Sequence, residues 1–476
     1  MEIAASGGGH VDTRGNPYSV ILRLATPTMI AMLSQSIVNE IDIVFFAHLP
    51  CPESSNGQAA LAPSLILLWA FGGSLSAIAV GTQALTARRY AERKPEEAGA
   101  VLTNATFFAL LASVIFAGLG YAILKPLLHV MVKNPAAAEY AIGYSQWRFL
   151  GITSMALTFA FKAFFDGLGR TRVHMVSAVL MNVVNIALCW LLIYGNWGFP
   201  RMGPPGAGLA ALISTWVGLG IMMIYGAGKE TRSTFKWIDS KKISKKLTWE
   251  ILRLAIPGGV ATMAVMGGFG FFLFVVNKLD AVTGGSVAKG ACGQAEAVNG
   301  AASTAIIGVL KLTFTACLAF GTATATIVSQ SLGEKDPDKA ARFGWSSVRL
   351  GLVIFGIVGL CEGLFFTKDI LGFVSHSAAV QEAALVPMRM MGLATPVIAV
   401  AMILTQALFG SGNTRFVMIV ELILHFTCLM PLAWLLGMTL NLGLPGIWSS
   451  AIVYIVVLAG AMVWKFAGGA WKKTEI

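Results

Sequence analysis

The chain has 476 residues, of which 56% are hydrophobic and only 12% are charged, and its formal net charge is +11. Soluble globular domains carry about 25% charged residues on average, so this composition excludes an ordinary soluble protein. The positive balance alone would also suit a nucleic-acid-binding protein, and the positions of the basic residues decide between that class and a membrane protein.

The apolar residues are gathered in runs long enough to cross the hydrocarbon core of a membrane, which takes about 20 residues of helix. In chain order, the predicted transmembrane helices are 20–47, 60–87, 98–123, 141–165, 173–195, 206–227, 251–277, 300–328, 342–366, 385–409, 415–437 and 445–466. We therefore predict an all-α polytopic membrane protein with 12 transmembrane helices in two six-helix lobes related by a pseudo-two-fold repeat.

Lys and Arg are concentrated in the tails and in the connections after the even-numbered helices, as at Arg88, Arg89 and Lys94. Under the positive-inside rule, this asymmetry predicts a multi-pass protein of the cell (inner) membrane with both termini in the cytoplasm. The basic excess therefore indicates orientation and not a nucleic-acid partner. The six cysteines are scattered without CxxC spacing, so we expect no disulfide framework and no metal site.

A polar connection, KETRSTFKWIDSKKISKKLTWE at residues 229–250, divides the helices into six and six. It separates an N-lobe at 18–228 from a C-lobe at 251–466 and is itself a basic cytoplasmic linker. Residues 1–17 lack the apolar core of a signal peptide and are predicted to be a cytoplasmic tail, as are residues 467–476.

The two halves also repeat in sequence. Five motifs of the first half return in order at an offset of 230 to 243 residues: RLATP as RLAIP, VGTQALT as FGTATAT, RFLGITS as RMMGLAT, GLGRTRVHM as GSGNTRFVM, and PPGAG as LPGIW. This agreement is strong evidence of internal duplication. Because each half has an even number of helices, the repeats are parallel, and a cleft between two such bundles is the usual substrate path of a transporter.

These features resemble the multidrug and toxic compound extrusion (MATE) family of transporters over about residues 18–466. The resemblance rests on the duplication, the prolines at the start of the first and seventh helices, the Gly-x-Gly-x-Thr-Arg turns, and the polar residues of three N-terminal helices. It implies two six-helix lobes with a central cleft. It also implies export of cationic or amphiphilic compounds against an inward flow of H⁺ or Na⁺, without a further cofactor.

The resemblance implies an ion- or proton-coupling pocket in the N-lobe. Asp42, in NEIDIVFFAHL, matches its acidic position, and Gln35 shares the Asp42 face two helical turns earlier. Tyr144 and Asn185 match other polar positions of this pocket, and Asn182 lies one turn before Asn185. An acid within the membrane is a functional candidate by default, although it could also serve as a hydrogen-bond partner between helices.

The sequence departs from the family at two positions. Many relatives carry an Asp where this chain has Cys189, and Lys162 stands at a position that is usually neutral. Because an isolated charge in a low-dielectric medium costs several kcal/mol, we expect Lys162 to pair with Asp42 and to take the place of a bound Na⁺. The alternative is that Lys162 extends to the membrane interface near Asp166.

Further candidates concern the substrate cleft. Glu40 lies about 200° around the helix from Asp42, so the two acids cannot share a pocket. Glu40 could face the cleft and attract a cationic substrate, or it could pair with another helix. In the C-lobe, Lys311, Glu421 and His425 are buried charges, with Glu421 and His425 four residues apart on one helix face. This pair is a candidate second proton site or a static network. Phe269 could stack on a cationic substrate or face lipid.

Other functions remain open at this stage. The chain has no GxxxxGK[ST] motif, so an ion gradient or another protein must supply the energy. The alternatives are a flippase for lipids or lipid-linked sugars, a passive channel, and a membrane-embedded enzyme, for which no HExxH or GxSxG motif is present. We expect a non-enzymatic monomer whose partners are a small organic cation or amphiphile and membrane lipids.

Overall fold

The computed structural model describes residues 15–132, 134–237, 239–282, 287–289, 295–375 and 377–474, without the side chains of residues 37–40, 240, 287–289 and 295–296. Within this part, 10 helices are long and apolar enough to span a membrane, or up to 12 if each of two bent helix pairs forms one span. The predicted all-α class is confirmed. The one addition among the described residues is a short antiparallel pair, β1 (Val287–Lys289) and β2 (Ala295–Ala297).

The first half of the chain contains eight α-helices. They are α1 (Pro17–Ala47), α2 (Glu53–Phe71), α3 (Ile78–Ala91), α4 (Pro95–Met131), α5 (Pro135–Leu150), α6 (Ile152–Gly167), α7 (Thr171–Tyr194) and α8 (Pro204–Ala227), with the short helices η1 (Gly73–Ala77) and η2 (Asn196–Gly198). Proline at the first position starts several of them, where its missing N–H costs nothing. Asn16 caps α1 and Asn134 caps α5.

The second half follows a connecting segment with α9 (Lys229–Phe235) and η3 (Ser240–Lys242). Its elements are α10 (Lys245–Val282), α11 (Val298–Gly333), α12 (Pro337–Leu360), η5 (Cys361–Phe365), α13 (Thr367–Val374), α14 (Ala378–Gly410), α15 (Thr414–Leu424), η6 (His425–Leu429), α16 (Met430–Trp434), η7 (Leu435–Thr439), α17 (Gly443–Ala467) and η8 (Ala470–Lys473). The segments η5, η6 and η7 are π-helical turns, which are rare and frequently occur at functional sites.

Two spans of the first half are broken, whereas their counterparts in the second half are continuous. The pair α2 and α3 bends by 44°, and the pair α5 and α6 bends by 45°. The second break lies at Gly151, whose repeat partner, Gly392, lies inside the unbroken α14. There the backbone of α14 packs directly on Gly363 of η5. The packing around each helix therefore decides whether it bends at this repeated position.

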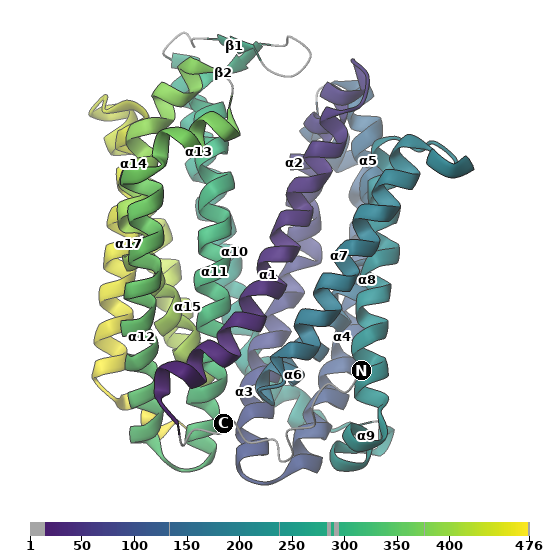
Figure 1. Ribbon diagram of the computed structural model, residues 1–476, viewed down its shortest axis with the longest axis vertical. Coiled ribbons are helices and arrows are strands. Elements are labelled where there is room, and N and C mark those ends of the chain that lie inside the picture. Colours follow the sequence, from purple (N-terminus) through teal and green to yellow (C-terminus); the bar gives the residue numbers. More distant parts are fainter. Residues whose placement is uncertain are drawn as a thin grey trace.

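The helices form two groups that diverge towards the end carrying β1 and β2 and come together at the opposite end (Figure 1). The first helix of each half reaches the other half. Val20, Ile21 and Leu24 of α1 belong to the apolar core of the second half. Ile251 and Leu254 of α10 belong to the core of the first. The first helix of each half therefore also contributes to the apolar core of the other half.

The segment between the halves is packed against the first half. The indole N–H of Trp237 donates to the backbone oxygen of Gly226 at 2.8 Å. The side chain of Asn104 on α4 bonds Lys242 O and Ser244 N. These contacts hold the segment that precedes α10 against α4 and α8.

The cysteines differ from expectation at one position. Cys51 is disulfide-bonded, so the expectation of no disulfide is wrong there. Cys189, Cys317, Cys361 and Cys428 are free thiols, and the described residues contain no group of His, Cys, Asp and Glu that could hold a metal ion.

Candidate functional site

Asp42 lies at the meeting point of α1, α5 and α7. Its carboxylate is buried, with 5% of the residue exposed. The Tyr144 hydroxyl donates to Oδ2 at 3.1 Å, and the Cys189 thiol lies 3.8 Å from Oδ1. A buried carboxylate needs such donors, because burial without them carries a large penalty. The structure thus brings together three of the predicted residues, each from a different helix.

Further polar contacts extend from Cys189 to α8. Its sulfur also lies 3.8 Å from Oδ1 of Asn185, and the Asn185 amide donates to Ser214 Oγ on α8 at 3.2 Å. The single S–H of Cys189 can serve Asp42 or Asn185 but not both at once. The thiol can therefore change partner when the charge of Asp42 changes.

Arg148 is a member of this site that the sequence analysis did not single out. Its guanidinium carbon lies 5.7 Å from the centre of the Tyr144 ring, and it is the positive charge that acts on Asp42. Its Nε is buried and has no hydrogen-bond partner in the part of the chain that the structure describes. The available signal was the spacing of Tyr144 and Arg148 in YSQWR, four residues apart on one helix face.

The expected ion pair between Lys162 and Asp42 is not formed. Lys162 lies on α6, and the carboxylate that acts on it is Asp166, one turn further along the same helix. The positive charge near Asp42 comes from Arg148 instead. The expectation failed because helical periodicity predicts which face of a helix carries a side chain. It does not predict which residues of other helices lie next to that side chain where the span bends.

The other predicted residues of the first half are distributed as follows. Gln35 is half-buried on α1, towards the middle of that helix. Asn182 is buried on α7, and neither its amide nitrogen nor its oxygen has a hydrogen-bond partner in the described part. The side chain of Glu40 lies outside the described residues, so its predicted place in the cleft stays a prediction.

The second half contains the predicted pair of Glu421 and His425, with a third member. His425 Nδ1 lies 2.7 Å from the backbone oxygen of Glu421 and 3.5 Å from Oε2. The Tyr454 hydroxyl of α17 donates to Glu421 Oε2 at 2.5 Å. The His425 ring also abuts α10, where no side chain would fit at Gly268. The cluster thus joins three helices at the π-helical turn η6.

The remaining C-lobe candidates lie apart from this cluster. Lys311 is half-buried in α11. Phe269 is 37% exposed on α10 and stacks on Phe272 with ring centres 6.3 Å apart. Glu362, in the π-helical turn η5, is a half-buried acid that the sequence analysis missed, and Thr313 donates to it. Its second oxygen has no partner among the described residues.

At the end opposite β1 and β2, hydrogen bonds join the two halves. The side chain of Gln83 donates to Thr322 O and Thr326 Oγ1, both at 2.9 Å. Ser329 donates to Ala84 O at 2.8 Å. We call the following residues the inter-half contact: Gln83, Ala84, Asp166 and Gly167 of the first half, and Thr322, Thr326, Ser329 and Gln330 of the second.

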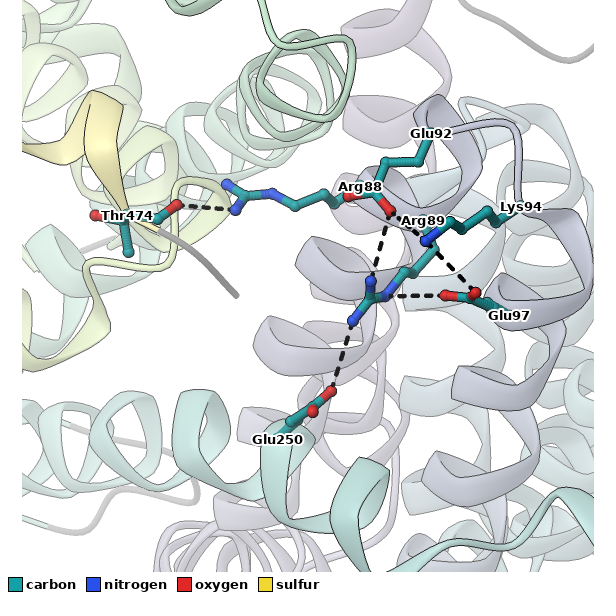
Figure 2. Close-up of polar contacts among 7 residues, drawn as sticks. All are labelled: Arg88, Arg89, Glu92, Lys94, Glu97, Glu250 and Thr474. Atoms are coloured by element: carbon teal, nitrogen blue, oxygen red, sulfur yellow. Dashed lines mark hydrogen bonds and ion pairs between the residues drawn. The ribbon is translucent and has the colours of Figure 1, made fainter.

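An ion-pair network lies at the same end (Figure 2). Arg89 of α3 contacts Glu92, Glu97 of α4 and Glu250 of α10 at 3.5 to 3.8 Å. Its neighbour Arg88 donates to the backbone oxygen of Thr474 at 2.9 Å. The side chain of Thr474 in turn accepts from Asn413 of the second half. The network therefore ties α3 to both α10 and the C-terminal segment.

Two groups of membrane-spanning helices that meet at one end, with buried ionisable side chains inside each, are the architecture expected of a polytopic membrane transporter. Comparison with known proteins gives the family: the MatE family profile matches residues 27–191 and 291–435. The chain therefore belongs to the MATE transporter family, as the resemblance in the sequence implied.

Curated relatives and solved structures agree with this assignment. The chain is 25% identical to the probable multidrug resistance protein NorM of Thermotoga maritima, covering 96% of this chain and 93% of NorM. It is 28% identical to the NorM of Caulobacter vibrioides, covering 95% and 92%. A MOP superfamily transporter from Pyrococcus furiosus superposes with a TM-score of 0.85 at 20% identity, over 97% of this chain and 98% of that one. The structural likeness establishes the fold.

Proposed function

We propose that the chain is a secondary active antiporter that exports cationic or amphiphilic organic compounds in exchange for H⁺, by alternating access between its two halves. The similarity to proteins named multidrug resistance proteins supports the substrate class. The observation that carries the proposal is the buried Asp42 carboxylate, held by donors from two other helices. Ionisable groups within membrane-spanning helices mark ion pathways and proton relays.

The surroundings of Asp42 favour H⁺ over Na⁺ as the coupling ion. A hard cation prefers several oxygen ligands, whereas Asp42 is surrounded by a hydroxyl, a thiol and the positive charge of Arg148. That charge opposes a bound Na⁺ but stabilises the carboxylate after its proton has left. Arg148 thus takes the electrostatic role that the sequence analysis proposed for Lys162.

The proposed orientation places both termini in the cytoplasm. The described chain starts and ends at the end of the molecule that carries the inter-half contact, which is also where the basic segments at 88–94 and 229–246 lie (Figure 1). The positive-inside rule assigns this end to the cytoplasm. In this orientation the halves part towards the outside of the cell, and we propose a monomer surrounded by lipid as the working unit.

The proposal is tested by transport of ethidium, a fluorescent lipophilic cation, in proteoliposomes under an imposed H⁺ or Na⁺ gradient. We expect the wild type to respond to the H⁺ gradient and Asp42→Asn to fall to the rate of protein-free liposomes. Asp338→Asn, at an exposed ion pair with Lys472, is the matched control and should transport normally. Equal H⁺-driven rates for Asp42→Asn and the wild type would refute the coupling role of Asp42.

A further inference from the structure

Next to the inter-half contact, the first half contains three ionisable side chains that the proposed function does not yet use, two of them buried and one half-buried. They are Lys162 and Asp166 on α6 and His174 on α7. Asp166 and His174 are 2% and 0% exposed. His174 Nδ1 lies 3.9 Å from Asp166 Oδ2, which is too long for a hydrogen bond.

The side chains of Asp166 and His174 have no hydrogen-bond partners among the described residues. Both carboxylate oxygens and both ring nitrogens are buried, and no described residue donates to or accepts from them. Buried polar groups in native proteins are almost always hydrogen-bonded, so an orphaned acid and imidazole side by side call for a functional reason. A group that binds and releases a proton in another conformation provides one.

The cluster is coupled to the inter-half contact through the backbone. The Thr326 hydroxyl donates to the carbonyl oxygen of Asp166 itself at 2.9 Å. The Gln330 amide donates to the carbonyl oxygen of Gly167 at 2.8 Å. When the halves part at this end, both bonds break and water reaches the end of α6. Burial and hydration of Asp166 therefore follow the conformation of the whole molecule.

Polar side chains of α7 lie on one side of the helix between this cluster and Asp42, with a stretch of about 12 Å around Ala178 that separates His174 from Asn182. His174, Asn182, Asn185 and Cys189 recur on one side of the helix, and Cys189 contacts Asp42. The face is about 22 Å long at 1.5 Å per residue. Midway along it, the amide of Asn182 is buried without a described partner, which is the kind of polar site that an ordered water satisfies.

Several ionisable side chains lie on the other helices that pack on α6, but the one that acts on Asp166 and His174 is Lys162. Their ionisable side chains near this end are Arg88, Arg89 and Tyr90 of α3, Glu96 and Glu97 of α4, Arg172 of α7, Tyr225 of α8 and Glu334 directly after α11. Arg89 is paired with Glu97, and the Tyr225 ring packs on Phe165. Among the described residues, Lys162 is the charged group that acts on Asp166 and His174.

The direction of the proton linkage follows from this geometry. Closing this end moves the Asp166 carboxyl out of water into a site without donors, which penalises its ionised form. Closure therefore favours uptake of a proton by the Asp166 carboxyl, and opening favours its release. By linkage, this carboxyl shifts the equilibrium towards the closed arrangement in acid and towards the open one in alkali.

We propose that Asp166, flanked by Lys162 and His174, is the site from which the coupling proton leaves the protein. The proton travels along the polar face of α7 from the Asp42 carboxyl while this end is closed. It then passes from the Asp166 carboxyl to cytoplasmic water when the halves part, and Asp166 remains as a carboxylate beside Lys162. This inference rests on the proposed H⁺ antiport.

The test measures opening and not transport. Ser329 is fully buried in the inter-half contact, so the thiol of a Ser329→Cys variant reports opening through its rate of maleimide alkylation, located by peptide mass spectrometry. The rate is divided by that of the unfolded protein at each pH. Between about pH 5.5 and about pH 8, we expect it to rise about fivefold or more in the parent variant, a coupling of ordinary size.

Adding Asp166→Asn should abolish this rise and leave alkylation slow at every pH, because the amide mimics the protonated acid. His174→Gln, a second variant in case the first does not fold, should shift the midpoint of the rise. Asp338→Asn is the matched control and should change nothing.

A pH dependence that Asp166→Asn leaves intact would overturn the proposal. If Asp42→Asn still transports normally, the proposed function fails instead, and the two failures are thereby distinguished.

Discussion

At the scale of single residues, the site around Asp42 is a balance of one negative charge, one positive charge and two donors. Tyr144 and Cys189 stabilise the carboxylate by hydrogen bonds, and Arg148 stabilises it through space. Protonation of Asp42 weakens all three of these contacts at once, because it removes the negative charge. The side chains then become free to move, because a neutral acid attracts neither donor as strongly as the anion did.

Arg148→Gln should shift the pH dependence of transport. Without the nearest positive charge, the Asp42 carboxyl holds its proton more tightly, so the pH midpoint of H⁺-driven ethidium transport should rise by about one unit or more. Arg349→Gln, at an exposed position on α12, is the control and should leave the midpoint in place. An unchanged midpoint in Arg148→Gln would show that this guanidinium does not act on the coupling site.

The residues of this site were only partly predictable. Tyr144, Asn185 and Cys189 were placed with Asp42 by the resemblance to relatives, and the structure brings these side chains together. Lys162 was assigned to the wrong carboxylate, and Arg148 was missed. Both errors have one cause: the depth of a side chain in α5 and α6 depends on the bend at Gly151, which local sequence does not specify.

At the scale of elements, the halves meet through helices that approach at backbone distance. A side-chain carbon added at Gly81 of α3 would lie 2.5 Å from the backbone oxygen of Ile251 on α10. Atoms of a rigid helix cannot yield as a flexible side chain can, so this contact tolerates no methyl group. The closed arrangement therefore depends on the small residue at this crossing.

Gly81→Ala should weaken the closed arrangement by about 1–3 kcal/mol, the usual cost of overpacking. Alkylation of the thiol in the Ser329→Cys background measures the effect and should become faster. The control is Gly220→Ala on α8, where the added carbon meets no atom within 4 Å. That change should leave alkylation unaffected and slightly stabilise the helix. Identical rates in the two variants would contradict the role given to the α3–α10 crossing.

The elements themselves were largely predictable from hydropathy, because a run of about 20 apolar residues has few alternatives to a spanning helix. The first and last residues of the helices were less predictable. The first and seventh helices were predicted to begin at 20 and 251, but α1 begins at Pro17 and α10 at Lys245, so Pro27 and Pro257 lie further inside long helices than predicted. The polar turns that precede these prolines are helical because they pack on the opposite half. The hydropathy of the sequence does not report such a tertiary contact.

At the scale of the whole molecule, α1 and α10 would keep the two halves together during the proposed alternating access. Each helix starts in the core of one half and continues in the other. Asp42 lies in the part of α1 within the first half, whereas Val20 and Leu24 of the same helix anchor in the second. A change of charge at Asp42 therefore acts on a helix that both halves share.

The central claim is that Asp42 exchanges a proton for a cationic substrate, and proton release on substrate binding tests it most directly. Tetraphenylphosphonium is added to purified protein in weakly buffered detergent solution, and the pH change is recorded. The account predicts release of protons by the wild type and by Asp338→Asn, and none by Asp42→Asn. Equal release by Asp42→Asn and the wild type, or binding of the cation by the wild type without any release, would contradict it.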